Sequence, residues 1–131
     1  MIVLDASALL EFLLGTPRGE EVGVRLEDMD GRWHAPDLVD LEVTQVLRRW
    51  EASGALDPER AQAAVELLVD LPLVRHGARA LVPRIWGLRA NLSAYDAAYV
   101  ALAEGLEAPM LTCDERLARA PGHRAAVRLV P

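Results

Sequence analysis

Short, mostly apolar runs alternate along the chain with stretches of helical length. The runs of strand type cover residues 1–4, 33–35, 73–74, 108–112 and 126–130. The stretches between them predict helices at residues 7–14, 20–28, 38–53, 58–70, 78–89, 93–104 and 115–119. Short apolar strands that alternate with helices are typical of an α/β protein with a mainly parallel sheet covered on both faces.

Turn and capping residues mark the ends of several predicted helices. Residues 30–31, Asp-Gly, predict a turn, and Asp37 and Asp57 stand where N-caps are expected. Gly54 and Gly105 stand where helices are expected to end. The segment 38–53 is therefore predicted to form one helix with defined ends, and the segment 93–104 is predicted to form another.

The predicted helix at 38–53 has an apolar stripe with an acid at its border. The stripe is assigned to Leu38, Leu41, Val46 and Trp50, widened by Val43 and Leu47. Glu42 lies beside this stripe. Because burying an unpaired carboxylate is costly, Glu42 is expected near a cation, a hydrogen-bond donor or an open cleft.

The composition limits the functions that the chain can have. Its 131 residues are 52% hydrophobic, which suits one domain over residues 1–131. No secretory leader precedes Asp5 and no apolar stretch approaches bilayer length, so we expect a cytoplasmic protein with no membrane contact. The single cysteine, Cys113, can form neither an internal disulfide nor a zinc site on its own.

All 14 basic residues are arginine, and the net charge is -6. A mechanism that needs a lysine is therefore excluded, which disfavours receiver-type phosphoryl-transfer domains. The negative balance also argues against nucleic-acid binding by a broad basic surface. Divalent cations held by carboxylates would reverse the sign locally and keep such binding open.

Four carboxylates stand at positions that suggest chemistry. Asp5 ends the first predicted strand and Asp114 follows the fourth, so both lie where sites form at the carboxyl edge of a parallel sheet. Glu42 and Asp96 stand among core-forming residues of predicted helices. Carboxylates that converge without histidine or cysteine favour a hard cation such as Mg²⁺, which promotes phosphodiester hydrolysis.

Three of the four acids also have a purely structural interpretation. Asp5 is a plausible strand-end turn residue, Glu42 a half-exposed helix residue, and Asp96 the N3 partner of Ser93 in a capping box. Glu115, beside Asp114, is an alternative fourth acid, and Asp40 is expected mainly to complement the helix dipole. The three histidines fall on different segments and are expected on the surface or in turns.

Four motifs resemble the PIN-domain family, specifically VapC-type toxins. Their order and spacing agree with that family over essentially the whole chain. The motifs are Ile-Val-Leu-Asp-Ala-Ser-Ala-Leu at 2–9, Pro-Asp-Leu at 36–38 with Glu-Val at 42–43, Tyr-Asp-Ala-Ala-Tyr-Val-Ala-Leu-Ala at 95–103, and Leu-Thr-Cys-Asp-Glu-Arg-Leu-Ala at 111–118.

The resemblance implies a three-layer α/β/α fold with a five-stranded sheet of order 3-2-1-4-5. It also implies a Mg²⁺-dependent endoribonuclease, with Mn²⁺ as a possible substitute, that acts on RNA as the toxin of a toxin–antitoxin pair. A VapB-type antitoxin and a homodimer are the implied partners. By position, the catalytic and metal-binding residues are Asp5, Glu42, Asp96 and Asp114, supported by the hydroxyls of Ser7 and Thr112.

The main alternative is a catalytically silent PIN-like module that binds RNA or a protein through the same cleft. Intact acids disfavour this alternative without proving turnover.

Overall fold

Five parallel strands form the centre of the structure, a computed structural model that describes residues 1–29 and 31–131. Asp30, in the predicted turn, lies outside the described residues. The strand order is β3-β2-β1-β4-β5, as predicted. The strands are β1 (Ile2–Leu4), β2 (Trp33–Pro36), β3 (Leu73–His76), β4 (Met110–Thr112) and β5 (Val127–Leu129).

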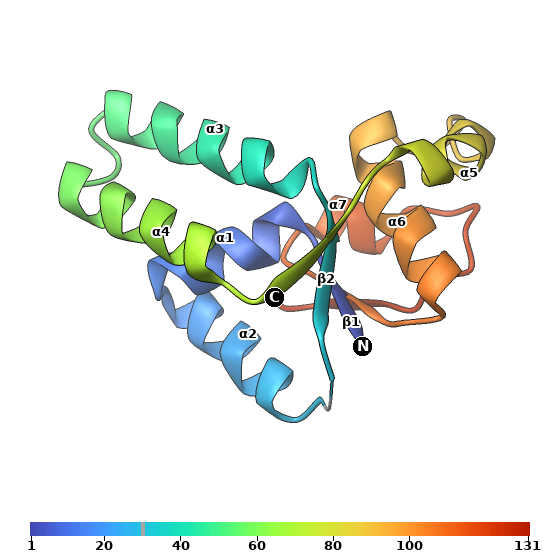
Figure 1. The fold of residues 1–131 in the computed structure, drawn as a ribbon, viewed down its shortest axis with the longest axis horizontal. Helices are drawn as coiled ribbons and strands as arrows, with labels where there is room; N and C mark the ends of the chain where they lie inside the picture. The colour runs from blue at the N-terminus through green and yellow to red at the C-terminus, as the bar shows by residue number, and fades with distance from the viewer. Residues whose placement is uncertain (30) are drawn as a thin grey trace.

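Helices cover both faces of this sheet, which makes the predicted α/β/α arrangement (Figure 1). One layer holds α1 (Ala6–Leu14), α2 (Pro17–Glu27), α3 (Val39–Ala52) and α4 (Pro58–Asp70); α1 contacts the other three. The other side holds a 3₁₀ turn (Arg79–Leu81), α5 (Val82–Gly87), α6 (Ala94–Leu106) and the short α7 (Glu115–Ala118). None of the helices in the described residues is long and apolar enough to cross a bilayer.

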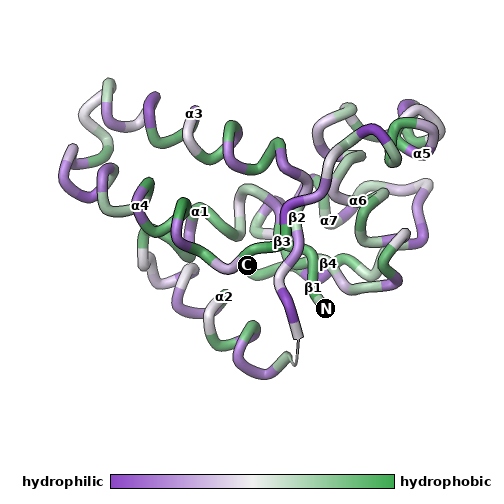
Figure 2. The backbone as a smooth tube through the Cα atoms, in the orientation of Figure 1, coloured by the Kyte–Doolittle hydropathy of each residue, from purple (hydrophilic) through white to green (hydrophobic). Residues whose placement is uncertain are grey.

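The sheet is buried at its centre, and the outer helices are amphipathic. All three residues of β1 and all three of β4 are buried. In Figure 2, hydrophilic and hydrophobic segments alternate along α2, α3 and α4, as expected of helices with one face toward the core. The carboxyl ends of β1 and β4 therefore lie at the edge of the buried core.

The buried face of α3 differs from the predicted stripe. Val39, Val43 and Leu47 are buried, whereas Leu41 is 76% exposed and Trp50 is 36% exposed. This helix carries apolar residues on two sides, and packing against α1 and α4 selects the side spaced at four residues. The prediction that Leu41 and Trp50 share the core face is wrong.

The start of α3 also differs from the prediction. Its N-cap is Leu38, which makes no side-chain capping bond, and not Asp37. The backbone N–H of Asp37 instead donates to the carbonyl of His76, at 2.8 Å. This bond continues the pairing of β2 with β3 by one residue, so Asp37 is held by the sheet and a turn delays the helix.

Two predicted helix boundaries on the other side of the sheet are corrected. The stretch 78–89 is divided into the 3₁₀ turn and α5, and Pro83 lies in the first turn of α5, where its missing N–H is tolerated. The helix α6 passes through Gly105 and ends at Leu106; its C-cap, Glu107, adopts a left-handed φ of 51°.

The expectation that the histidines lie separately on the surface or in turns is wrong for two of them. His34 is buried on β2, and its Nδ1 lies 2.8 Å from Nε2 of His76 on β3. The two rings stack, with centroids 5.1 Å apart. Burial and the nearby His76 lower the pKa of His34, in that order of importance, so the neutral form of His34 is favoured.

Candidate active site

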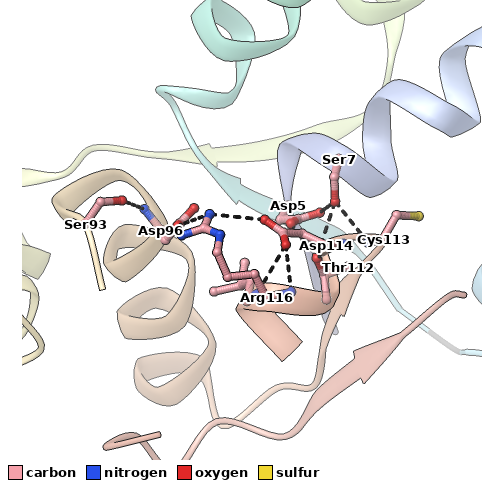
Figure 3. A network of polar contacts seen from close by, with 9 residues as sticks. Asp5, Ser7, Ser93, Asp96, Thr112, Cys113, Asp114 and Arg116 are labelled. Carbon is pink, nitrogen blue, oxygen red and sulfur yellow. Dashed lines mark hydrogen bonds and ion pairs between the residues drawn. The ribbon is translucent and has the colours of Figure 1, made fainter. Parts of the chain in front are cut away.

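Asp5 is the most deeply buried acid of the candidate site. It follows β1 and is the N-cap of α1, and only 4% of the residue is exposed. Its Oδ1 accepts hydrogen bonds from the Ser7 hydroxyl at 2.8 Å and the Ala8 N–H at 2.9 Å, and its Oδ2 accepts one from the Thr112 hydroxyl at 2.6 Å (Figure 3). Three donors therefore fix the orientation of this carboxylate.

Burial raises the pKa of Asp5 to about 6, despite these three donors and with a small further contribution from the nearby charge of Asp114. Desolvation is the largest cause, so the charged form is costly. A cation beside the Asp5 carboxylate would stabilise its charged form, because the cation compensates for the lost hydration.

The supporting hydroxyls also join the ends of β1 and β4. The Ser7 Oγ accepts the backbone N–H of Cys113 at 2.9 Å, and the Thr112 Oγ1 accepts that of Asp114 at 2.9 Å. Each hydroxyl thus donates to Asp5 and accepts from the loop that carries Asp114. The two acids predicted from the strand ends are brought to the same edge of the sheet by this network.

Asp114 is the N-cap of the short helix α7. Its Oδ1 accepts the N–H groups of Arg116 at 2.9 Å and Leu117 at 3.3 Å. The neighbouring Glu115 forms an ion pair with Arg119, which follows α7 directly. The geometry therefore selects Asp114, and not Glu115, as the acid that faces Asp5.

Asp96 stands in the first turn of α6, where Ser93 is the N-cap. The Ser93 hydroxyl accepts the backbone N–H of Asp96 at 3.2 Å, so this half of the predicted capping box forms. The Asp96 carboxylate instead accepts from Arg116, with 3.0 Å between Oδ2 and Nη2. Its side chain therefore faces the site.

Glu42, in the first turn of α3, accepts a 2.5 Å hydrogen bond from the hydroxyl of Tyr99 on α6. Burial raises the pKa of Glu42; the Tyr99 bond opposes this shift and the charge of Asp96 adds to it. Burial and the bond to Glu42 raise the pKa of Tyr99, so the phenol remains a donor. Glu42 is therefore oriented by a buried phenol.

The four predicted acids line one cavity of about 340 Å³. Tyr99, Trp50 and Arg49 also line it, together with apolar residues of α1 and α3. Asp40 lies elsewhere, paired with Arg75 at 2.8 Å. The structure thus brings together Asp5, Glu42, Asp96 and Asp114 from four separate segments.

The chemistry of these donors fits a hard divalent cation. All four side chains offer carboxylate oxygens, the ligands that Mg²⁺ and Mn²⁺ prefer. Within residues 1–29 and 31–131, no three acidic, histidine or cysteine side chains stand close enough together to hold a metal ion as placed. A guanidinium, that of Arg116, bonds to two of the acids instead.

Arg116 and Tyr99 are site residues that the sequence analysis did not single out. Tyr99 follows Asp96 by three residues, so the two share one face of α6, and this spacing was an available signal. Arg116 follows Asp114 by two residues, but its bond to Asp96 depends on how α6 and α7 meet. No local pattern in the sequence indicates that bond.

The fold and the cavity define an α/β protein with an acidic site at the carboxyl edge of a parallel sheet. The sequence model of the PIN domain matches residues 2–123, and the chain belongs to the PIN-domain family, in its VapC branch. Ribonuclease VapC12 of Mycobacterium tuberculosis is 40% identical over 130 residues, 99% of each chain. Ribonuclease VapC9 of the same organism is 39% identical over 131 residues, which are 100% of this chain and 99% of the relative.

Solved structures share the fold at low sequence identity. The sarcin–ricin loop-cleaving toxin VapC20 of Mycobacterium tuberculosis superposes with a TM-score of 0.67 at 15% identity, covering 89% of this chain and 92% of that one. A toxin–antitoxin complex from Klebsiella pneumoniae gives a TM-score of 0.69 at 16% identity, covering 100% and 98%. These likenesses support the three-layer architecture.

Proposed function

We propose that this protein is a metal-dependent endoribonuclease and the toxin of a toxin–antitoxin pair. The observation that carries the proposal is the convergence of four carboxylates on one cavity, the most buried of them held by two hydroxyls and an N–H group. Relatives about 40% identical over nearly the whole chain are named ribonucleases, which supports the same chemistry here.

Asp5 and Asp96 are proposed to hold the metal most directly, with Glu42 and Asp114 completing its shell directly or through water. Mg²⁺, or Mn²⁺ in its place, would supply activation of a water and stabilisation of the leaving oxygen. Ser7 and Thr112 hold the Asp5 carboxylate in one orientation. Tyr99 does the same for Glu42, so the acids keep their places while the substrate binds.

The proposed partners are RNA, a VapB-type antitoxin and a second copy of the chain. A neighbour solved as a toxin–antitoxin complex supports the antitoxin. Large apolar side chains stand exposed on α3 and α4, which is a suitable surface for a homodimer; these are Leu41, Leu67 and Val69. Light scattering that finds only monomer at high concentration would contradict the dimer.

We further propose that residues 1–131 act as one PIN domain in the cytoplasm.

The proposal is tested by incubating total cellular RNA with the purified, antitoxin-free protein in Mg²⁺, in Mn²⁺ and in EDTA. Asp96→Asn removes one proposed ligand, and Glu115→Gln removes an equal charge from an acid that faces away from the cavity. Discrete fragments that vanish with EDTA and with Asp96→Asn, but persist with Glu115→Gln, are expected. Binding of RNA without cleavage, by protein that binds the metal, would favour the silent module instead.

A further inference from the structure

One nitrogen of Arg116 bridges two of the cavity's acids. Its Nη2 lies 3.0 Å from Oδ2 of Asp96 and 3.3 Å from Oδ2 of Asp114. These acids come from different elements, α6 and α7, and Figure 3 shows the guanidinium between them. The chain thus places a cation of its own on two oxygens that the proposed function assigns to a metal.

We propose that Arg116 is an internal counter-ion that competes with the divalent cation for Asp96 and Asp114. The proposal rests on the proposed function, because it assumes that these carboxylates bind metal. A guanidinium and a hard cation compete for the carboxylate oxygen that both approach, here Oδ2 of Asp96 and Oδ2 of Asp114. A metal bound through either Oδ2 is opposed by Arg116, both by the shared oxygen and by the repulsion between two cations.

The exchange is energetically accessible because Arg116 is exposed. Its side chain is 73% exposed, so water can solvate the guanidinium once it leaves the acids. Ion pairs in such exposed surroundings are weak, because water and salt screen them. A compact divalent ion with several carboxylate ligands displaces an exposed monovalent one readily, yet the competition costs measurable affinity.

The other arginine near the cavity does not duplicate this arrangement. Arg49 lines the cavity but makes no hydrogen bond or ion pair with the four acids among the described residues. Arg119 is the matched control. It lies three residues after Arg116 and pairs with Glu115, which is not an acid of the cavity. Arg116→Gln and Arg119→Gln remove the same charge from the same region, and only the first frees Asp96 and Asp114.

The test is the affinity for Mn²⁺ alone, measured by calorimetry and by the loss of the free Mn²⁺ electron spin resonance signal, with no RNA present. Arg116→Gln is expected to bind Mn²⁺ about three- to tenfold more tightly than the wild type, because two competing exposed ion pairs are lost. Arg119→Gln is expected to match the wild type within about twofold. Thermal unfolding provides a second readout: saturating Mn²⁺ should raise the Tm of Arg116→Gln by more than that of the wild type.

An unchanged or weaker Mn²⁺ affinity in Arg116→Gln overturns the inference, and a weaker one would mean that Arg116 preorganises the acids. Equal tightening in Arg119→Gln overturns it as well, because general charge would then explain the effect. Failure of the proposed function would give a different result. In that case, either the wild type would not bind Mn²⁺, or its binding would persist in Asp5→Asn and Asp96→Asn.

Discussion

The hydroxyl of Thr112, the last residue of β4, donates a 2.6 Å hydrogen bond to the carboxylate of Asp5, which follows β1. The two residues are adjacent because β1 and β4 are paired in parallel, with Leu4 opposite Leu111. Neighbouring carboxyl ends of a parallel sheet thus provide both a buried acid and a donor that orients it.

Thr112→Val should destabilise the protein by about 1–3 kcal/mol, because a buried carboxylate oxygen loses its donor while the side-chain volume is kept. The pKa of Asp5 should rise further, and Mn²⁺ binding should weaken at neutral pH. Denaturant unfolding and metal titration check both effects. Thr112→Ser keeps the hydroxyl and should lie close to the wild type; equal loss in both variants would contradict the role of the hydrogen bond.

Asp5→Asn should stabilise the metal-free protein at pH 8. In the wild type the folded-state pKa of Asp5 is about 6, above its ordinary value of 3.8, so folding favours the protonated form. Stability from this group is full below pH 3.8 and is lost as the pH rises to about 6, a difference of up to about 3 kcal/mol. Removing the charge avoids this loss.

The expected advantage of Asp5→Asn is therefore greatest above pH 6 and shrinks toward pH 4. Unfolding midpoints measured across this range without metal check the prediction. Glu51→Gln, on the exposed surface of α3, is the matched control and should show no comparable dependence. An advantage for Asp5→Asn that is constant with pH would contradict the burial of the charge as its cause.

Tyr99→Phe should move the acid side of the pH–activity profile toward higher pH. The Tyr99 hydroxyl lowers the pKa of Glu42 against the effect of burial, so its removal lets that pKa rise. Glu42 would then ionise only at higher pH, and metal-dependent cleavage would fall most below neutrality. The change in stability should be about 1 kcal/mol, because the ring is kept.

Tyr95→Phe is the control for this profile, since Tyr95 lies on the same helix and is largely exposed. Its profile should coincide with that of the wild type. A parallel loss of rate at every pH in Tyr99→Phe, with no displacement of the acid side, would assign Tyr99 a role other than tuning Glu42.

Arg84→Met should lower the free energy of unfolding without altering metal affinity, because the buried Glu104 carboxylate loses its main donor. Arg84 makes two hydrogen bonds to Glu104, at 2.8 and 3.0 Å, and the Glu104 side chain is almost wholly buried. The pKa of Glu104 is lowered, chiefly by this bond, so its contribution is present above the ordinary pKa and is lost as the pH falls through the lowered value. Unfolding at pH 7 and Mn²⁺ titration check the prediction; a loss of metal affinity would contradict it.

The strand order was predicted from the resemblance to the PIN-domain family, because local patterns indicate the strands but not their order. With β1 and β4 as neighbours, the position of the acidic edge follows from the parallel arrangement. Asp5 and Asp114 follow apolar strands, and parallel strands bring their carboxyl ends together. The face of α3 was not predictable from periodicity alone. Val39 and Leu41 both fit apolar patterns, and only contact with α1 and α4 decides which is buried.

The long-range polar contacts were also beyond the sequence pattern. The pairing of His34 with His76 follows from the register of β2 and β3, which short apolar runs do not specify. The contact of Arg116 with Asp96 follows from the approach of α7 to α6. In both cases the partners are far apart in sequence, so spacing carries no information about them.

The most direct test of the central claim is the chemistry of the RNA ends produced by the wild-type protein with Mg²⁺ in ¹⁸O-labelled water. If a water activated in the carboxylate cavity is the nucleophile, the new terminal phosphates should carry one ¹⁸O from solvent, and no 2′,3′-cyclic phosphate should form. EDTA and Asp5→Asn should both stop the reaction. Cyclic phosphate ends, formed equally well in EDTA, would mean that the ribose hydroxyl attacks without a metal and would contradict the account.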